Sequence, residues 1–131
     1  MRILTVIYEF PPVGGGGGRA AYDICKGLVE RGHQVTVLTA HMQGLPFEEY
    51  KDGIRLVRIS SLRNKTFGAS FFTMLAYVLS GLWAGFRLIR LDRPDIIHTH
   101  FAVPSGALAW MLSVLTGIPY VLTAHLGDVP G

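Results

Sequence analysis

Segments with β-strand character alternate with segments of helical periodicity along almost the whole chain. The segments rich in β-branched and apolar residues, which predict strands, are 2–8, 33–39, 54–59, 95–100 and 120–123. The segments with apolar residues at helical spacing are 19–31, 69–91 and 105–116, with Ser105 as an expected N-cap and Gly32 and Gly117 as expected stops. This alternation predicts an α/β fold with a parallel sheet covered by helices on both faces. Right-handed crossovers then give a doubly wound, three-layer α/β/α domain of about five strands in the order 3-2-1-4-5.

The size and composition of the chain fit one folded domain covering residues 1–131. Half of the 131 residues are apolar and 16% are charged, which is enough for a core and argues against disorder. The net charge is +3 without a dense basic block, so nucleic acid is not an expected partner.

The single cysteine, Cys25, falls on the apolar stripe of the first helix and predicts a small buried side chain in a reducing, cytoplasmic setting. Arg55 and Arg58 indicate that the third strand has a partly exposed side near a sheet edge.

Five consecutive glycines, Gly14–Gly18, lie where the first strand leads into the first helix. Because glycine has no Cβ, the backbone N–H groups of such a loop can approach a ligand closely. The helix that follows presents unpaired N–H groups and a partial positive charge to the same place. The segment therefore predicts an anion site, most simply for phosphate, with a connector that binds nothing as the alternative. No Gly-Lys-Ser/Thr follows the glycines, which excludes a Walker-type loop.

The predicted topology places ligands beyond the carboxyl ends of strands 1 and 4, where the strand order reverses. This rule selects the glycine loop, residues 98–104 and residues 124–131. His98 and His100 are two residues apart on a strand and so share one face. Zinc would need further ligands, so we expect no metal there and assign one histidine to substrate and the other to packing. In the last segment His125 is the better candidate for substrate contact, with a structural loop histidine as the alternative.

An uncharged stretch from Thr66 to Phe86, bounded by Lys65 and Arg87, is long enough to cross a membrane. It also contains several Gly, Ser and Thr residues, so we expect a buried or membrane-surface helix instead of a span. Its many large apolar residues need to be covered. Two alternatives stay open at this point: contact with a membrane surface and pairing with a second copy of the chain.

Four segments in this order resemble the N-terminal domain of family 4 glycosyltransferases. They are 8–15, 27–39, 95–100 and 123–128, and together they extend over nearly the whole chain. The resemblance implies the N-terminal, Rossmann-like half of a two-domain GT-B enzyme. Such enzymes transfer a sugar from a nucleotide diphosphate sugar to an acceptor glycan or lipid-linked acceptor, retain the anomeric configuration and need no metal or other cofactor.

The resemblance also implies roles for particular residues. Gly15, Gly16 and Gly17 would bind the donor diphosphate, and His125 would be the catalytic residue beside the donor sugar. Apart from the resemblance, we expect His100, Asp128 and Arg19 to contact acceptor or substrate. This sequence departs from the family in its longer glycine run and in Leu126, where the family often has glycine.

The family's nucleotide-binding C-terminal domain has no counterpart within these residues, so the sequence predicts a truncated, acceptor-side domain. We expect this chain alone to have little or no transferase activity. The alternative function is a stand-alone nucleotide- or phosphate-binding module without catalysis. We expect a cytoplasmic protein, with peripheral contact at the inner membrane face or a homodimer as open alternatives.

Overall fold

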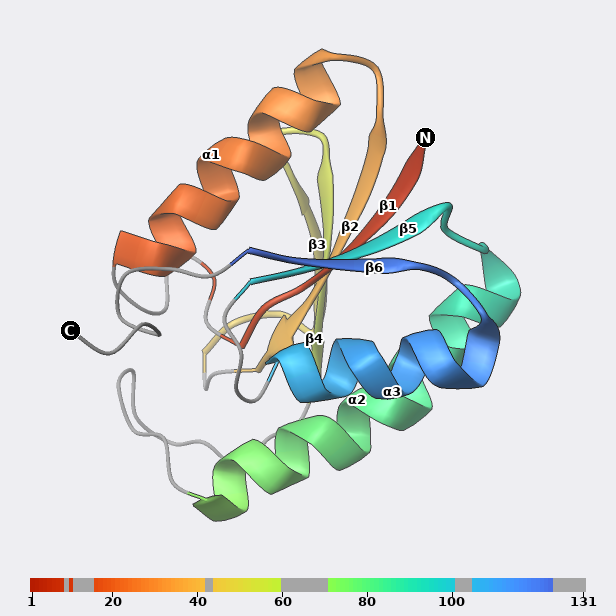
Figure 1. The fold of residues 1–131 in the computed structure, drawn as a ribbon. Helices are drawn as coiled ribbons and strands as arrows, with labels where there is room; N and C mark the ends of the chain where they lie inside the picture. Colours follow the sequence, from red (N-terminus) through yellow and green to blue (C-terminus); the bar gives the residue numbers. More distant parts are fainter. Residues whose placement is uncertain (9, 11–15, 42–43, 60–70, 101–104, 124–131) are drawn as a thin grey trace, which may run out of the picture.

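The computed structural model describes residues 1–8, 10, 16–41, 44–59, 71–100 and 105–123, which form one sheet with helices on both faces (Figure 1). The strands are β1 (Arg2–Val6), β2 (Gln34–Ala40), β3 (Glu48–Lys51), β4 (Ile54–Ile59), β5 (Ile96–His100) and β6 (Tyr120–Thr123). The helices are α1 (Gly16–Glu30), α2 (Phe71–Leu91) and α3 (Ala107–Thr116). The strand order is β3-β4-β2-β1-β5-β6. Figure 1 shows α1 on one face of the sheet and the pair α2 and α3 on the other.

Five of the six strands confirm the predicted parallel order. β4, β2, β1, β5 and β6 are the predicted strands 3-2-1-4-5, and every neighbouring pair among them is parallel. The sixth strand, β3, is absent from the predicted strands, and it pairs antiparallel with β4. The two strands are joined by Asp52 and Gly53, whose φ angles of 53° and 80° are both positive. Positive φ angles at both residues of a two-residue connection are typical of a type I′ turn, whose twist matches that of the two strands of a hairpin.

Each face of the sheet has its own apolar core, because alternate residues of a strand point to opposite sides. In β1, Leu4 and Val6 join the core under α2 and α3, while Ile3 joins the core under α1. Cys25 of α1 is fully buried in the core under α1, as predicted, with its Sγ 3.8 Å from Thr5 Oγ1.

α2 lies close to α3 and to the sheet, and two glycines one helical turn apart face these neighbours. A Cβ at Gly81 would clash with Leu108, and one at Gly85 would lie 2.8 Å from Leu112 Cδ1. Tyr77, a turn before Gly81, is fully buried and donates a hydrogen bond of 3.1 Å to the Leu38 carbonyl oxygen. The glycines thus allow helix–helix contact, and the tyrosine joins α2 to the middle of the sheet.

Helix boundaries confirm some of the predicted signals and correct others. Gly117 has a φ of 77° and donates its N–H to the Ser113 carbonyl oxygen at 2.8 Å, which confirms it as the stop of α3. Ser105 does not cap this helix: Gly106 holds the N-cap position without a side-chain bond, and Ser105 is buried instead.

Arg58 was expected to be partly exposed and is only 3% exposed, because β3 extends the sheet beyond β4.

Candidate functional site

The strand order reverses between β1 and β5, and the carboxyl ends of these strands lie together. β1 pairs with β2 on one side and with β5 on the other, with Val6 opposite Leu38 and Thr99. Figure 1 shows that α1 begins at this same end of the sheet. A doubly wound sheet binds its ligands at such a place, so the predicted location of the site coincides with the observed switch point.

The glycine run contributes the first turn of α1. The helix begins at Gly16, three residues earlier than the sequence predicts, and therefore includes Gly16, Gly17 and Gly18. The first four N–H groups of a helix lack partners within the helix and carry its partial positive charge. No acidic residue lies in this turn to offset that charge, and Arg19 follows it with an exposed side chain. This end of α1 is suited to an anion by its backbone and by its charge.

Two histidines of β5 lie on the face of the sheet that α1 covers. The rings of His98 and His100 are 4.3 Å apart between centroids. His98 Nε2 lies 2.7 Å from Thr123 Oγ1 at the carboxyl end of β6. His100 is the last residue of β5 and has no exposed surface. Its contact with acceptor or substrate stays a prediction.

Several predicted site residues lie outside the described residues: Gly15, His125 and Asp128. Their roles stay predictions that follow from the family resemblance. Of the predicted site residues that are described, Gly16, Gly17 and Arg19 share the first turns of α1, and His100 ends β5. Across the described ranges, no three side chains of His, Cys, Asp or Glu come together as a metal site requires.

A cavity of about 360 Å³ lies at the opposite end of the sheet, near the amino ends of β1 and β2. It is lined by two arginines that are each paired with a carboxylate: Arg2 with Asp92 at 3.0 Å and Arg55 with Glu48 at 3.3 Å. No sequence motif marks this cavity, since its residues come from distant segments with ordinary compositions. Its paired charges make it a weaker anion site than the start of α1.

The buried thiol of Cys25 gives a direct test of the packing beneath α1. Burial raises the pKa of Cys25 to about 11, against a weaker opposing effect of its hydrogen bond with Thr5. At pH 8 we expect a disulfide reagent to modify the folded chain roughly 100-fold more slowly than the urea-unfolded chain. Burial of the neutral thiol raises the folded pKa, so its contribution to stability is complete below the unfolded pKa of about 9 and is lost as the pH rises through the folded pKa of about 11. Equal labelling rates in the two states would contradict this account.

The topology and the glycine-led helix define a Rossmann-like domain of the kind found in GT-B enzymes. One solved structure of that kind is sucrose-phosphate synthase from Thermosynechococcus elongatus, with a TM-score of 0.71, 20% identity, and coverage of 95% of this chain and 33% of the other. At that identity the likeness concerns the fold alone.

The sequence comparisons identify the family. The family model for the "Glycosyl transferase 4-like domain" matches residues 15–131, so the chain belongs to this glycosyltransferase family. Glycogen synthase of Mycobacterium tuberculosis is 34% identical over 145 aligned positions, which cover 95% of this chain and 33% of that protein. N-acetyl-alpha-D-glucosaminyl L-malate synthase of Bacillus anthracis is 28% identical, covering 98% of this chain and 32% of that protein. The chain thus spans about a third of the length of these curated relatives.

Proposed function

We propose that this chain is the acceptor-side domain of an enzyme that transfers a sugar from a nucleotide diphosphate sugar to an acceptor with retention of configuration. The observation that carries the proposal is the start of α1 at Gly16, with three glycines in its first turn at the switch point between β1 and β5. Family membership and the sugar-transferring relatives support the reaction class. The span of about a third of those relatives supports a need for a second, donor-binding domain.

The chemistry proposed for this turn is stabilisation of the leaving diphosphate. Negative charge grows on the β-phosphate as the bond to the sugar breaks, and fixed backbone donors stabilise that charge without reorganising. Side chains at Gly16 or Gly17 would stand between those donors and the phosphate. His125 is proposed as the catalytic residue that lies against the donor sugar. No metal is required in this scheme, because the amides and the helix end supply the positive potential.

The test is a titration of the 14.4 kDa chain with UDP, ADP and pyrophosphate, followed by the amide signals of Gly16, Gly17 and Gly18 in NMR spectra. We expect these signals to shift, with a dissociation constant on the order of a millimolar, since the domain supplies one wall of the proposed cleft. Turnover of nucleotide sugar by the chain alone should be negligible. Micromolar nucleotide binding would instead favour the stand-alone module, and unmoved glycine amides would contradict the proposal.

A charge variant separates anion binding from folding. Gly17→Glu removes a glycine from the first turn and places a negative charge there, which favours the helix but repels a phosphate. We therefore expect the pyrophosphate-induced shifts to disappear while the melting temperature is unchanged or higher. Gly27→Glu makes the same charge change near the other end of α1 and should leave the shifts in place. Equal loss in both variants would show a general effect of net charge and would contradict a site at the helix start.

A further inference from the structure

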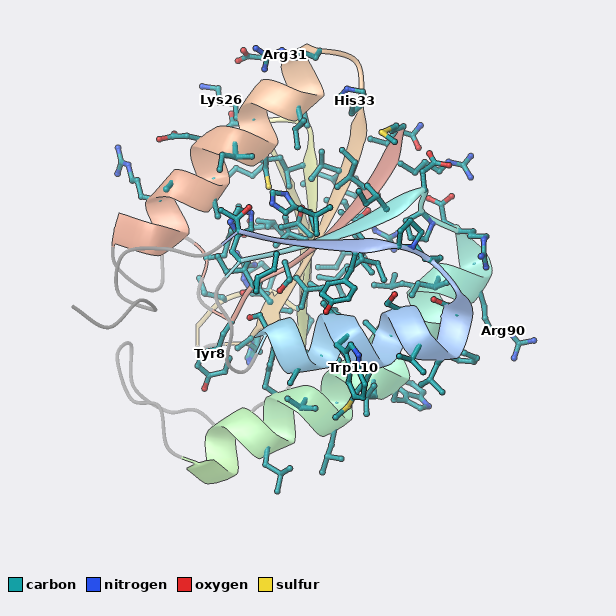
Figure 2. All side chains as sticks on the ribbon, viewed as in Figure 1. Tyr8, Lys26, Arg31, His33, Arg90 and Trp110 are labelled. Carbon is teal, nitrogen blue, oxygen red and sulfur yellow. The ribbon has the colours of Figure 1, made fainter. Side chains whose placement is uncertain are left out.

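The outer face of α2 and α3 exposes an unusual amount of apolar surface. Leu75, Leu79, Trp83 and Phe86 of α2 lie at helical spacing along one stripe, and Trp83 is 69% exposed. α3 adds Trp110, Val114 and Leu115, all more than half exposed. Figure 2 shows Trp110 on the side of the molecule away from α1. We call these seven residues the α2–α3 face. Large apolar side chains exposed together on two neighbouring helices indicate a surface that binds something.

The α2–α3 face has a basic border. Exposed Arg87 and Arg90 lie beside its aromatic rings, with Arg87 Cζ 5.6 Å from the Trp83 centroid and Arg90 Cζ 5.9 Å from the Phe86 centroid. A groove between the two helices is lined by Trp83, Phe86 and both arginines, and Leu115 of α3 closes it. Neither α2 nor α3 contains an Asp or Glu residue. The face therefore combines apolar and aromatic contact with positive charge that no carboxylate of the two helices offsets.

We propose that the α2–α3 face binds the surface of an anionic lipid membrane, with α2 lying in the plane of the interface. Helices that bind in this way have Trp, Phe and Leu on one side and Arg or Lys at the border, where the cations reach lipid phosphates. Tryptophan in particular suits the boundary between headgroups and acyl chains. No helix among the described residues is long and apolar enough to cross a membrane. The proposal does not depend on the sugar-transfer function.

Charge argues against a second copy of the chain as the occupant. A two-fold contact centred on the groove at Trp83 and Phe86 would bring the arginines of one copy near those of the other. The two helices hold no carboxylate to pair with them, and Asp92, just after α2, is already paired with Arg2. An anionic bilayer meets the same arginines with opposite charge.

The two tryptophans of the chain make the proposal directly testable. Both, Trp83 and Trp110, belong to the α2–α3 face, so intrinsic fluorescence reports on this face without added labels. Vesicles of phosphatidylcholine with one-third phosphatidylglycerol should shift the emission to the blue, and brominated acyl chains should quench it. Vesicles of phosphatidylcholine alone should bind much more weakly, and high salt should reverse binding to the anionic ones.

Paired variants locate the contact. Trp83→Ser and Leu79→Ser should each lower the vesicle partition coefficient by about tenfold without a change in melting temperature, since both side chains are mostly exposed. The double variant Arg87→Gln/Arg90→Gln should lower it by about thirtyfold. Lys26→Gln/Arg31→Gln removes the same charge from exposed positions in α1 and directly after it, on the opposite side of the molecule, as Figure 2 shows. This control should change binding by about twofold or less.

Three results would overturn the proposal. The first is the absence of any spectral shift with anionic vesicles. The second is equal loss of binding in the α1 control and in the Arg87→Gln/Arg90→Gln variant, which would mean that net charge alone attracts the lipid. The third is a dimer in light scattering that Trp83→Ser dissociates, because the face would then be covered by a second copy.

Discussion

Replacement of Gly81 by leucine should destabilise the protein by about 3 kcal/mol, measured as the free energy of unfolding in urea. Even the first carbon of a side chain at this position would clash with Leu108 and lie 3.1 Å from Ile59 Cδ1. A leucine side chain would push α2 away from both α3 and the sheet. Overpacking of this kind forces side chains off their preferred rotamers and shifts the backbone, so better helix propensity cannot offset it.

Gly27→Leu is the matched control for this prediction. Gly27 also lies within a helix, but a Cβ there would meet only Arg31 Nη1, the flexible end of an exposed side chain, at 3.3 Å. The same substitution should be neutral or should stabilise the protein by up to about 1 kcal/mol. A Gly81→Leu protein as stable as the Gly27→Leu protein would show that α2 is not held against α3 as described.

Removal of the charge of Glu49 should cost about 2 kcal/mol of stability, because it leaves a buried guanidinium without its counter-charge. Arg58 is 3% exposed; its Nη2 donates to Glu49 Oε1 at 2.6 Å and its Nη1 to the Pro46 carbonyl oxygen at 3.0 Å. Breaking a buried pair costs about 3–5 kcal/mol, and the partial exposure of Glu49 reduces that figure. The measurement is chemical denaturation of the Glu49→Gln protein.

Two further proteins make this result decisive. Glu48→Gln breaks the neighbouring pair with Arg55, which is more exposed, and should cost less than about 0.5 kcal/mol. The double variant Glu49→Gln/Arg58→Met replaces the buried charge by an apolar side chain and should recover most of the stability lost in Glu49→Gln. Similar losses in Glu48→Gln and Glu49→Gln would mean that Arg58 is as well hydrated as Arg55.

The parallel sheet could be predicted because its signals are local. Apolar strands and helices with different periodicities alternate along the chain, and the handedness of crossovers then leaves few arrangements. β3 carries no such signal: its sequence, Glu-Glu-Tyr-Lys, is polar and mostly exposed, and it forms a strand because the turn at Asp52 and Gly53 folds it back on β4. The burial of Arg58 depends on that same pairing. A charged residue predicts exposure unless its distant partners are known.

The sequence predicts where the candidate site lies better than it predicts which side chains form it. Topology alone locates the switch point, and the glycine run marks the segment that enters it. The start of α1 could not be predicted, since glycine is a poor helix former, and only the fold shows that Gly16, Gly17 and Gly18 belong to the first turn. The strand position of His100 predicted a substrate contact, whereas its complete burial could not be predicted from the strand alone.

The position of β1 has a consequence for how the molecule is assembled. Among the strands that the structure describes, β1 is the only neighbour that β2 and β5 share. Loss of the opening residues would therefore divide the sheet into two halves with no hydrogen bonds between them. The halves are contributed by stretches of chain before and after α2, so β1 cannot complete its pairing until β5 has been synthesised.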